Sequence, residues 1–133
     1  MSILDINLAD RQELKVLPDN EEVELRIARA EVTPNRNNPD KNNLMLLFDV
    51  PSDPLVDDIR VWLPIPTKED KIENEKAYIK KSNRFLSFMD AFGIDSPLDT
   101  DLLPGQTGWV ILSEGDGLNG EPQNSVRRYI VRR

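Results

Sequence analysis

The chain has 133 residues and a formal net charge of -7, and its residues are 31% charged and 38% hydrophobic. That length fits one well-cored domain, and that apolar content argues against wholesale disorder. Cysteine and histidine are both absent, which excludes disulfides, zinc fingers, thiol nucleophiles and imidazole bases.

The first twenty residues are predicted to form an arm. Their apolar positions follow no regular period, and the segment ends in the turn signal Pro18-Asp19-Asn20. It lacks the pattern of a signal peptide, and no apolar run in the chain reaches membrane length. We therefore predict an arm over residues 1–20, one domain over residues 21–133, and a cytoplasmic protein without membrane contact.

Three strands are predicted in the first half of the domain. Alternating apolar and polar residues indicate strands over residues 21–32, 44–50 and 59–65. The polar run at residues 33–43, rich in asparagine and proline, predicts a long loop between the first two strands. In the third strand, Arg60 and Trp62 are expected to point outward together because side chains two residues apart share a face.

One helix and two further strands complete the domain. Apolar residues recur at helical spacing from Lys76 to Phe92. Thr67 with Asp70 resembles a helix N-cap, and Gly93 resembles a C-cap. Two more strands are predicted over residues 107–113 and 125–133, with a polar loop between them at residues 114–124.

The order of elements is therefore strand, strand, strand, helix, strand, strand. This is the order of the OB-fold, a mainly β, five-stranded Greek-key barrel with one helix between the third and fourth strands. OB-folds commonly bind oligonucleotides or oligosaccharides on the second and third strands and on the first and last loops. The two longest predicted inter-strand loops occupy those two positions.

Several stretches of the chain resemble a largely uncharacterised family found in bacteriophages and prophages. They are LPDNEEVELRIARAEV, LLFDV, KKSNRFLSFMDAFGI, LPGQTGWVIL and the closing N-x-V-x-x-Y, and they run from about Leu14 to Tyr129. Members of that family resemble single-stranded DNA-binding proteins and are encoded beside replication and recombination genes. The resemblance implies an OB-fold that binds single-stranded DNA without sequence preference in the host cytoplasm.

The same resemblance implies replication or recombination proteins as partners. Phage single-stranded DNA-binding proteins often end in an acidic tail that recruits such partners, whereas this chain ends in VRR. Recruitment through a tail is therefore not expected. The acidic N-terminal arm could replace the tail.

Binding a single strand requires cations along the backbone and aromatic faces on which bases stack. The third strand offers Arg60 and Trp62, and the last strand offers Arg127 and Tyr129 at the same spacing. Four further basic residues complete the predicted site: Arg26, Arg36, Lys41 and Arg128.

Packing roles remain open for the aromatic residues. Trp62 could cover the open end of the barrel, Tyr129 could pack as readily as it could stack, and Trp109 is expected in the core. The helical stripe of Lys76, Lys80 and Arg84 is interpreted as a solvated face, because the OB ligand surface lies away from the helix.

Two other classes of function stay open. The fold could serve as an interaction module for a replication or virion partner, with the acidic surface as its interface. An enzyme would need converging carboxylates, and pairs such as Asp57 with Asp58 give no sign of convergence. No nucleotide-binding or metal-binding motif is present, so we expect no catalysis and no cofactor.

Overall fold

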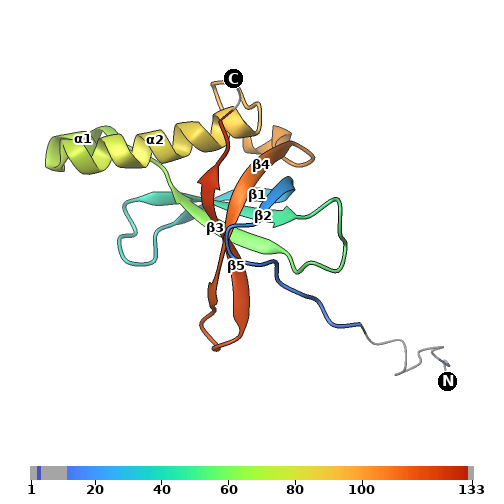
Figure 1. Ribbon diagram of the computed structural model, residues 1–133. Coiled ribbons are helices and arrows are strands. Elements are labelled where there is room, and N and C mark those ends of the chain that lie inside the picture. Colours follow the sequence, from blue (N-terminus) through green and yellow to red (C-terminus); the bar gives the residue numbers. More distant parts are fainter. Residues whose placement is uncertain (1–2, 4–11, 132–133) are drawn as a thin grey trace.

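The computed structural model describes Ile3 and residues 12–131 (Figure 1). In chain order its elements are β1 (Glu22–Pro34), β2 (Asn42–Asp49), β3 (Ile59–Pro64), α1 (Lys68–Glu73), α2 (Glu75–Ala91), the 3-10 helix η2 (Thr100–Leu102), β4 (Thr107–Asp116) and β5 (Pro122–Tyr129). The predicted order of strands and helix is confirmed. The strands extend into both predicted long loops, which shortens the connections to residues 35–41 and 117–121.

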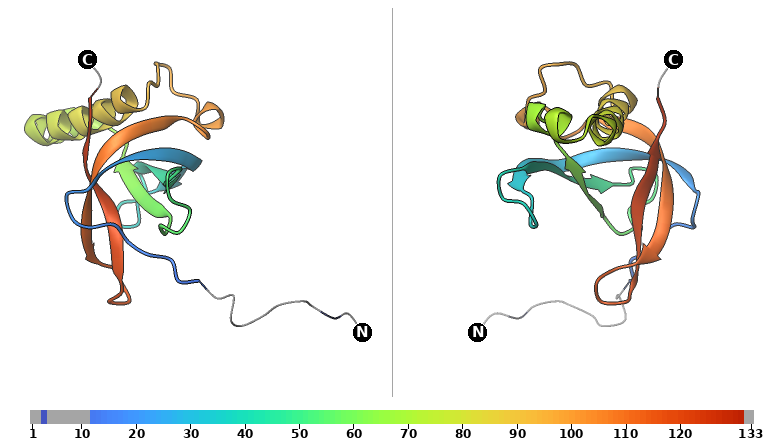
Figure 2. Two further views of the ribbon diagram at one scale, coloured as in Figure 1. Left: turned by 45° about the vertical axis from the view of Figure 1, so that its right-hand side comes forward. Right: turned by 90° about the vertical axis from the view of Figure 1, so that its left-hand side faces the viewer.

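The five strands form one antiparallel sheet in the order β3-β2-β1-β4-β5. The long central strand β1 pairs with β4 through its first half and with β2 through its second half. The sheet is open, but it curls until its two edge strands, β3 and β5, contact each other (Figure 2). The structure therefore has a mainly β, barrel-like fold.

The concave side of the curled sheet holds the core. Alternate residues of the first three strands are buried as predicted, among them Leu25, Phe48 and Leu63. α2 lies across one end of the sheet (Figure 2) and adds Phe88 and Phe92, which are 0% and 1% exposed. The Phe92 ring stacks on that of Phe48 with 5.4 Å between centroids, so helix and sheet share one hydrophobic core.

The predicted helix is divided in two at Asn74. Thr67 Oγ1 accepts a hydrogen bond from the Asp70 backbone N–H at 3.2 Å, and an Asp70 carboxylate oxygen accepts one from the Thr67 N–H at 2.9 Å. This capping box starts α1. Asn74 then accepts a hydrogen bond from the Ala77 N–H at 3.1 Å and caps α2. Gly93 has a positive φ of 65° beyond the end of α2, which agrees with its predicted role as a C-cap residue.

Two bulges decide which side chains point outward. The pairing of β1 with β2 shifts between Ile27 and Arg29, so Ala28 has no partner on β2. In the same way Arg127 of β5 has no partner on β4, because Val126 pairs with Leu112 and Arg128 with Ile111. A bulge moves the alternation of a strand by one residue. Inward and outward positions therefore exchange along both β1 and β5.

Residues 12–20, the continuous described stretch of the predicted arm, pack along the domain. The Lys15 N–H donates to the Leu55 carbonyl, and the Lys15 carbonyl accepts from the Asp57 N–H, both at 2.9 Å. Leu17 exchanges two hydrogen bonds with the Asn124 side chain of β5, at 2.8 and 2.9 Å. The segment thus contacts both the chain entering β3 and the edge strand β5.

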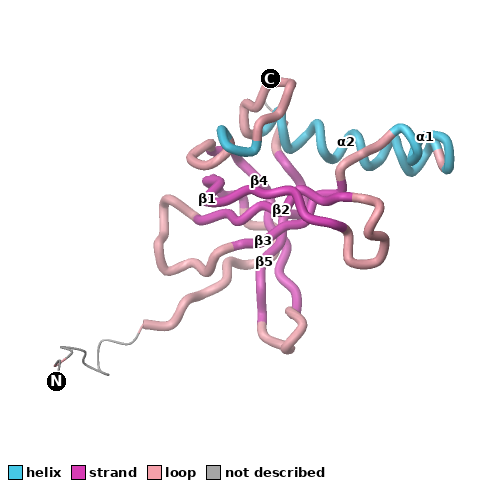
Figure 3. The backbone as a smooth tube through the Cα atoms, turned by 180° about the vertical axis from the view of Figure 1, so that it is seen from behind, coloured by secondary structure: helices cyan, strands magenta, loops and turns pink. Residues whose placement is uncertain are grey.

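The remainder of the predicted arm and the last two arginines lie outside the described residues. Figure 3 shows the helices gathered at one end of the sheet, with α1 and the start of α2 projecting beyond it. None of the helices in the described part of the chain combines the length and the apolar character needed to cross a membrane.

Candidate functional site

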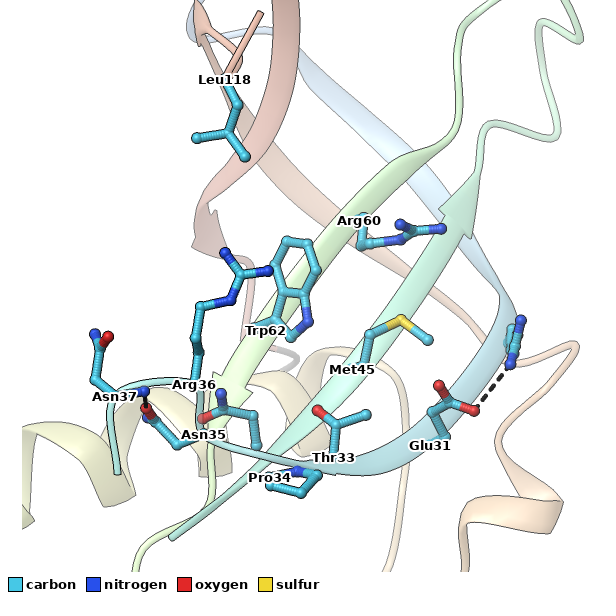
Figure 4. Close-up of a pocket in the computed structure, with 12 residues that line it drawn as sticks. Glu31, Thr33, Pro34, Asn35, Arg36, Asn37, Met45, Arg60, Trp62 and Leu118 are labelled. Carbon is cyan, nitrogen blue, oxygen red and sulfur yellow. Dashed lines mark hydrogen bonds and ion pairs between the residues drawn. The ribbon is translucent and has the colours of Figure 1, made fainter. Parts of the chain in front are cut away.

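A groove of about 650 Å³ lies on the outer face of β1, β2 and β3 (Figure 4). The strands supply its floor, and the loops at residues 35–41 and 117–121 supply side chains at its margins. Its lining consists of Arg29, Glu31, Thr33, Pro34, Asn35, Arg36, Asn37, Asn43, Met45, Arg60, Trp62 and Leu118. The groove thus lies on β1, β2 and β3 and beside the first and last inter-strand loops, which include the elements expected to carry a ligand.

Cross-strand pairing arranges the floor of the groove in ranks. Arg60 of β3 lies opposite Leu47 of β2, which in turn lies opposite Arg29 of β1. The next rank runs from Trp62 through Met45 to Glu31. The β1 bulge contributes to this order, because beyond Ala28 it turns Arg29 and Glu31 to the outer face.

Trp62 is the aromatic surface of the groove. Its side chain is 54% exposed, and the strand directs it outward between the buried Val61 and Leu63. The guanidinium carbon of Arg60 lies 6.0 Å from the centroid of the Trp62 ring, which is within the range of a cation–π contact. Arg60 and Trp62 therefore share the outer face of β3 as predicted.

Arginines dominate the charge of the groove. Among the residues that the structure describes, its lining holds Arg29, Arg36 and Arg60 against one acid, Glu31. Arg29 forms an exposed ion pair with Glu31 at 2.9 Å, whereas Arg36 and Arg60 form no ion pair with any residue that the structure describes. The groove is therefore locally cationic in a chain whose formal net charge is -7.

The loop at residues 35–41 brings Arg36 to the groove. The Asn35 side chain accepts hydrogen bonds from the N–H groups of Asn37 at 2.9 Å and Asn38 at 3.3 Å, which shapes the turn. The Asn35 N–H donates to the Lys41 carbonyl at 2.8 Å and closes the loop. In Figure 4 the side chain of Arg36 extends along the Trp62 ring.

Lys41 was predicted to contact phosphate, and the structure places it away from the groove lining. Its ammonium forms an ion pair with the buried Asp70 and lies 3.4 Å from a Glu73 carboxylate oxygen. Asp70 also accepts from the Lys81 ammonium at 3.2 Å. The hydrogen bond from Lys41 holds the pKa of Asp70 far below its ordinary value. Lys41 thus ties the loop to α1 and is not available as a free cation.

The predicted pair of Arg127 and Tyr129 on one outer face is wrong. Because Arg127 is the bulge residue of β5, Tyr129 turns inward and is 4% exposed. Its ring packs edge-on against Phe88 with 5.6 Å between centroids. Arg127 points to the surface and pairs with Asp19 at 2.9 Å. Tyr129 is a core residue, so its ring is not available for a base to stack on.

The other predicted cations also lie apart from the groove lining. Arg26 forms a two-point contact with the Asp49 carboxylate, with nitrogen–oxygen distances of 3.0 and 2.9 Å. Arg128 is exposed on β5, opposite Ile111 of β4. Trp109 was expected in the core, but it is 47% exposed on the outer side of β4. Of the eight predicted site residues, the groove brings together Arg36, Arg60 and Trp62.

Sequence reasoning missed several residues of the lining. Leu118 is fully exposed at the β4–β5 loop and points toward Trp62 in Figure 4. The lone leucine in the polar run EGDGLNGEPQN gave no signal, because single apolar residues are common on protein surfaces. Met45 and Asn43 gave none either, since their place depends on the strands beside them.

No protein-family model matches the chain, and no curated protein matches it significantly. Within the described residues, no three acidic side chains come together in a way that could hold a metal ion. What the groove offers chemically is an aromatic face, two arginines without ion-pair partners among those residues, and amide side chains at one margin.

Proposed function

We propose that this protein binds single-stranded DNA in the groove on β1, β2 and β3, without sequence preference and without catalysis. Bases would stack on Trp62, and Arg29, Arg36 and Arg60 would contact phosphates. The observation that carries the proposal is the exposed Trp62 beside two arginines that have no ion-pair partner in the described chain. An aromatic face accepts any base, so this chemistry suits a ligand with unpaired bases.

The fold supports the same proposal. We assign the chain to the OB-fold, because the strand order, the contact between β3 and β5, and the helix between β3 and β4 match that barrel. In OB-folds the ligand surface is formed by the second and third strands and the first and last loops. The groove here lies on β2 and β3 and beside those two loops, and β1 lines it as well.

The net negative charge is compatible with binding a polyanion. At physiological ionic strength the field of a charge decays over about 8 Å, so distant carboxylates act weakly on a phosphate in the groove. Glu31 is the one acid among the described residues of the lining, and Arg29 pairs with it. Local charge therefore favours phosphate although the total charge does not.

The biological setting that we propose is phage replication or recombination in the host cytoplasm. This part rests on the resemblance of the sequence to phage proteins of that class. Replication or recombination proteins would be the partners of the DNA-bound form, and no cofactor would take part.

A fluorescence titration tests the binding proposal. In a Trp109→Phe variant, Trp62 is the one remaining tryptophan, so stacking of a base should quench its emission directly. We expect oligo-dT to quench this signal and duplex DNA of the same length to bind more weakly. If three arginines contact phosphate, log K should fall with log salt concentration at a slope of about -2. Absence of binding at low salt, or binding that leaves Trp62 emission unchanged, would overturn the proposal.

A further inference from the structure

A second outward surface, on β4 and its neighbours, carries the other exposed tryptophan. Trp109 is 47% exposed, and Ile111 follows it on the same outer side of the strand. The Ile130 N–H donates to the Trp109 carbonyl at 3.0 Å, which sets Ile130 beside Trp109. These three residues form an apolar strip across β4 and the end of β5.

Charges of opposite sign flank this strip. On one side Glu22 of β1 lies opposite Ile111, and on the other side Arg128 of β5 lies opposite the same Ile111. Both charged side chains are exposed, and neither forms an ion pair with a residue in the described part of the chain. We name Glu22, Trp109, Ile111, Arg128 and Ile130 the Trp109 face.

We propose that the Trp109 face binds the Trp109 face of a second copy of this chain. We place the two-fold axis of this dimer in the contact plane, parallel to β4. Rotation about this axis brings the β1 side of one Trp109 face against the β5 side of the other, and it leaves each position along β4 at the same level in both copies. Glu22 of each copy then faces Arg128 of the other, at the level where Ile111 meets Ile111. Trp109 meets its own counterpart beside them.

The charge pattern favours a second copy over a nucleic acid. Glu22 and Glu24 lie on the β1 side of the strip, and two carboxylates beside the tryptophan would repel phosphate. Self-association instead joins Glu22 to Arg128 of the other copy, two ion pairs per dimer, around a centre of the apolar and aromatic type found at protein interfaces. Glu24, opposite Trp109 on β1, then lies at the edge of the contact beside Ile130 of the other copy.

The proposed interface is separate from the groove. It uses the first half of β1 with β4 and β5, whereas the groove uses the second half of β1 with β2 and β3. The two surfaces have no residue in common. A dimer of this kind leaves both grooves accessible, and its existence does not depend on whether the protein binds DNA.

Sedimentation equilibrium of the full chain, without DNA, tests the proposal. We expect a monomer–dimer equilibrium with a Kd between about 1 μM and about 1 mM. Trp109→Ser should raise the dimer Kd at least about 30-fold, the effect of losing an interface hot spot. Trp62→Ser is the matched control, because Trp62 is also about half exposed but lies in the groove, and it should leave the Kd unchanged.

Charge reversal tests the symmetry itself. Glu22→Arg alone sets arginine against Arg128, and Arg128→Glu alone sets glutamate against Glu22, so each variant should be monomeric. Mixing the two variants should produce a heterodimer, because both ion pairs then join opposite charges. Asp101→Arg and Lys80→Glu, which make the same charge changes at other exposed sites, are the controls, and thermal melts confirm that all variants fold.

A parent protein that stays monomeric throughout this range would overturn the proposal. Dimerisation that survives Trp109→Ser, or single charge variants that fail to combine when mixed, would also overturn it. None of these results bears on oligo-dT binding by the groove, so the failure of either proposal is distinguishable from the failure of the other.

Discussion

Strands β3 and β5 carry the same short pattern, an arginine two residues before an aromatic, and the fold uses the two copies in opposite ways. In β3, Arg60 and Trp62 both point outward and line the groove. In β5, the bulge at Arg127 turns Tyr129 into the core while Arg127 stays on the surface. Spacing of two residues therefore defines a shared face only where the ladder with the neighbouring strand is unbroken.

The largest expected effect is the loss of stability on truncation of Tyr129, the aromatic residue that points inward. Tyr129→Ala removes a buried ring that packs against Phe88 and Phe92. It should lower the free energy of unfolding by about 3–5 kcal/mol, as truncation of buried aromatics usually does. Denaturant unfolding measures this change, and the fraction that remains folded should bind oligo-dT as the parent does.

Tyr129→Phe sharpens the same test. The Tyr129 hydroxyl is buried without a hydrogen-bond partner in the described residues, and burial raises the pKa of Tyr129 to about 12. Removing an unpaired buried hydroxyl should leave stability unchanged or raise it. A folded Tyr129→Phe protein that binds oligo-dT less tightly would instead place the hydroxyl at the ligand and break the comparison.

Substitution of Trp62, the aromatic residue that points outward, should affect DNA binding and not folding. Trp62→Ala removes the proposed stacking face and should weaken binding of a short oligo-dT by about 1–3 kcal/mol. Stability should change little, because more than half of the side chain is exposed. Trp109→Ala is the control in the same titration, and equal losses for the two tryptophans would show that the groove has no special role.

The ion pair between Lys41 and Asp70 offers a test of how the loop at residues 35–41 is held against α1. Asp70→Asn weakens the link from Lys41 to α1 and should lower the free energy of unfolding by about 1.5–3 kcal/mol, the scale of a charge-assisted hydrogen bond. It should also weaken oligo-dT binding a few-fold, because the same loop carries Arg36. Binding that is unchanged in the variant would show that the loop holds its position without Lys41.

The stability of the parent and that of Asp70→Asn should depend differently on pH. The ion pairs and hydrogen bonds of Asp70 lower its pKa below the ordinary value of 3.8, so its contribution to stability is fully present above that value. The contribution is lost as the pH falls through the lowered pKa, because protonation costs the folded state more than the unfolded state. Asp70→Asn should therefore lose less stability than the parent between about pH 4 and pH 2 in urea titrations.

The smallest expected effect is a change in the salt dependence of binding, which should distinguish Arg36 from Arg127. Arg36→Ala removes a cation of the groove and should reduce the salt slope of binding by about 0.7, the value for one phosphate contact on a single strand. Arg127→Ala should leave the slope unchanged, because Arg127 pairs with Asp19 and lies outside the groove lining. A reduced slope for Arg127→Ala would extend the DNA path to β5.

Local sequence was enough to predict the elements and much of their packing. Alternation assigned the buried faces of β2 and β3, and helical spacing indicated the buried side of α2 up to Phe92, because these patterns act over a few residues. The capping residues Thr67 and Gly93 were likewise recognisable, since each cap is formed within one turn of the chain. Arg60 and Trp62 could be chosen as site residues because alternation places both on the outer face of one strand, and Arg36 because it lies in the loop between the first two strands.

Tertiary structure decided the positions that depend on a partner strand or a distant ion pair. The bulges at Ala28 and Arg127 arise from the register between strands, and they turned Arg29 outward and Tyr129 inward. Lys41, Arg26 and Arg127 were removed from the expected site by Asp70, Asp49 and Asp19, which lie 29, 23 and 108 residues away in the sequence. The hydrophobic period is a property of each segment by itself, whereas strand register and ion pairing depend on two segments that come together only in the folded protein.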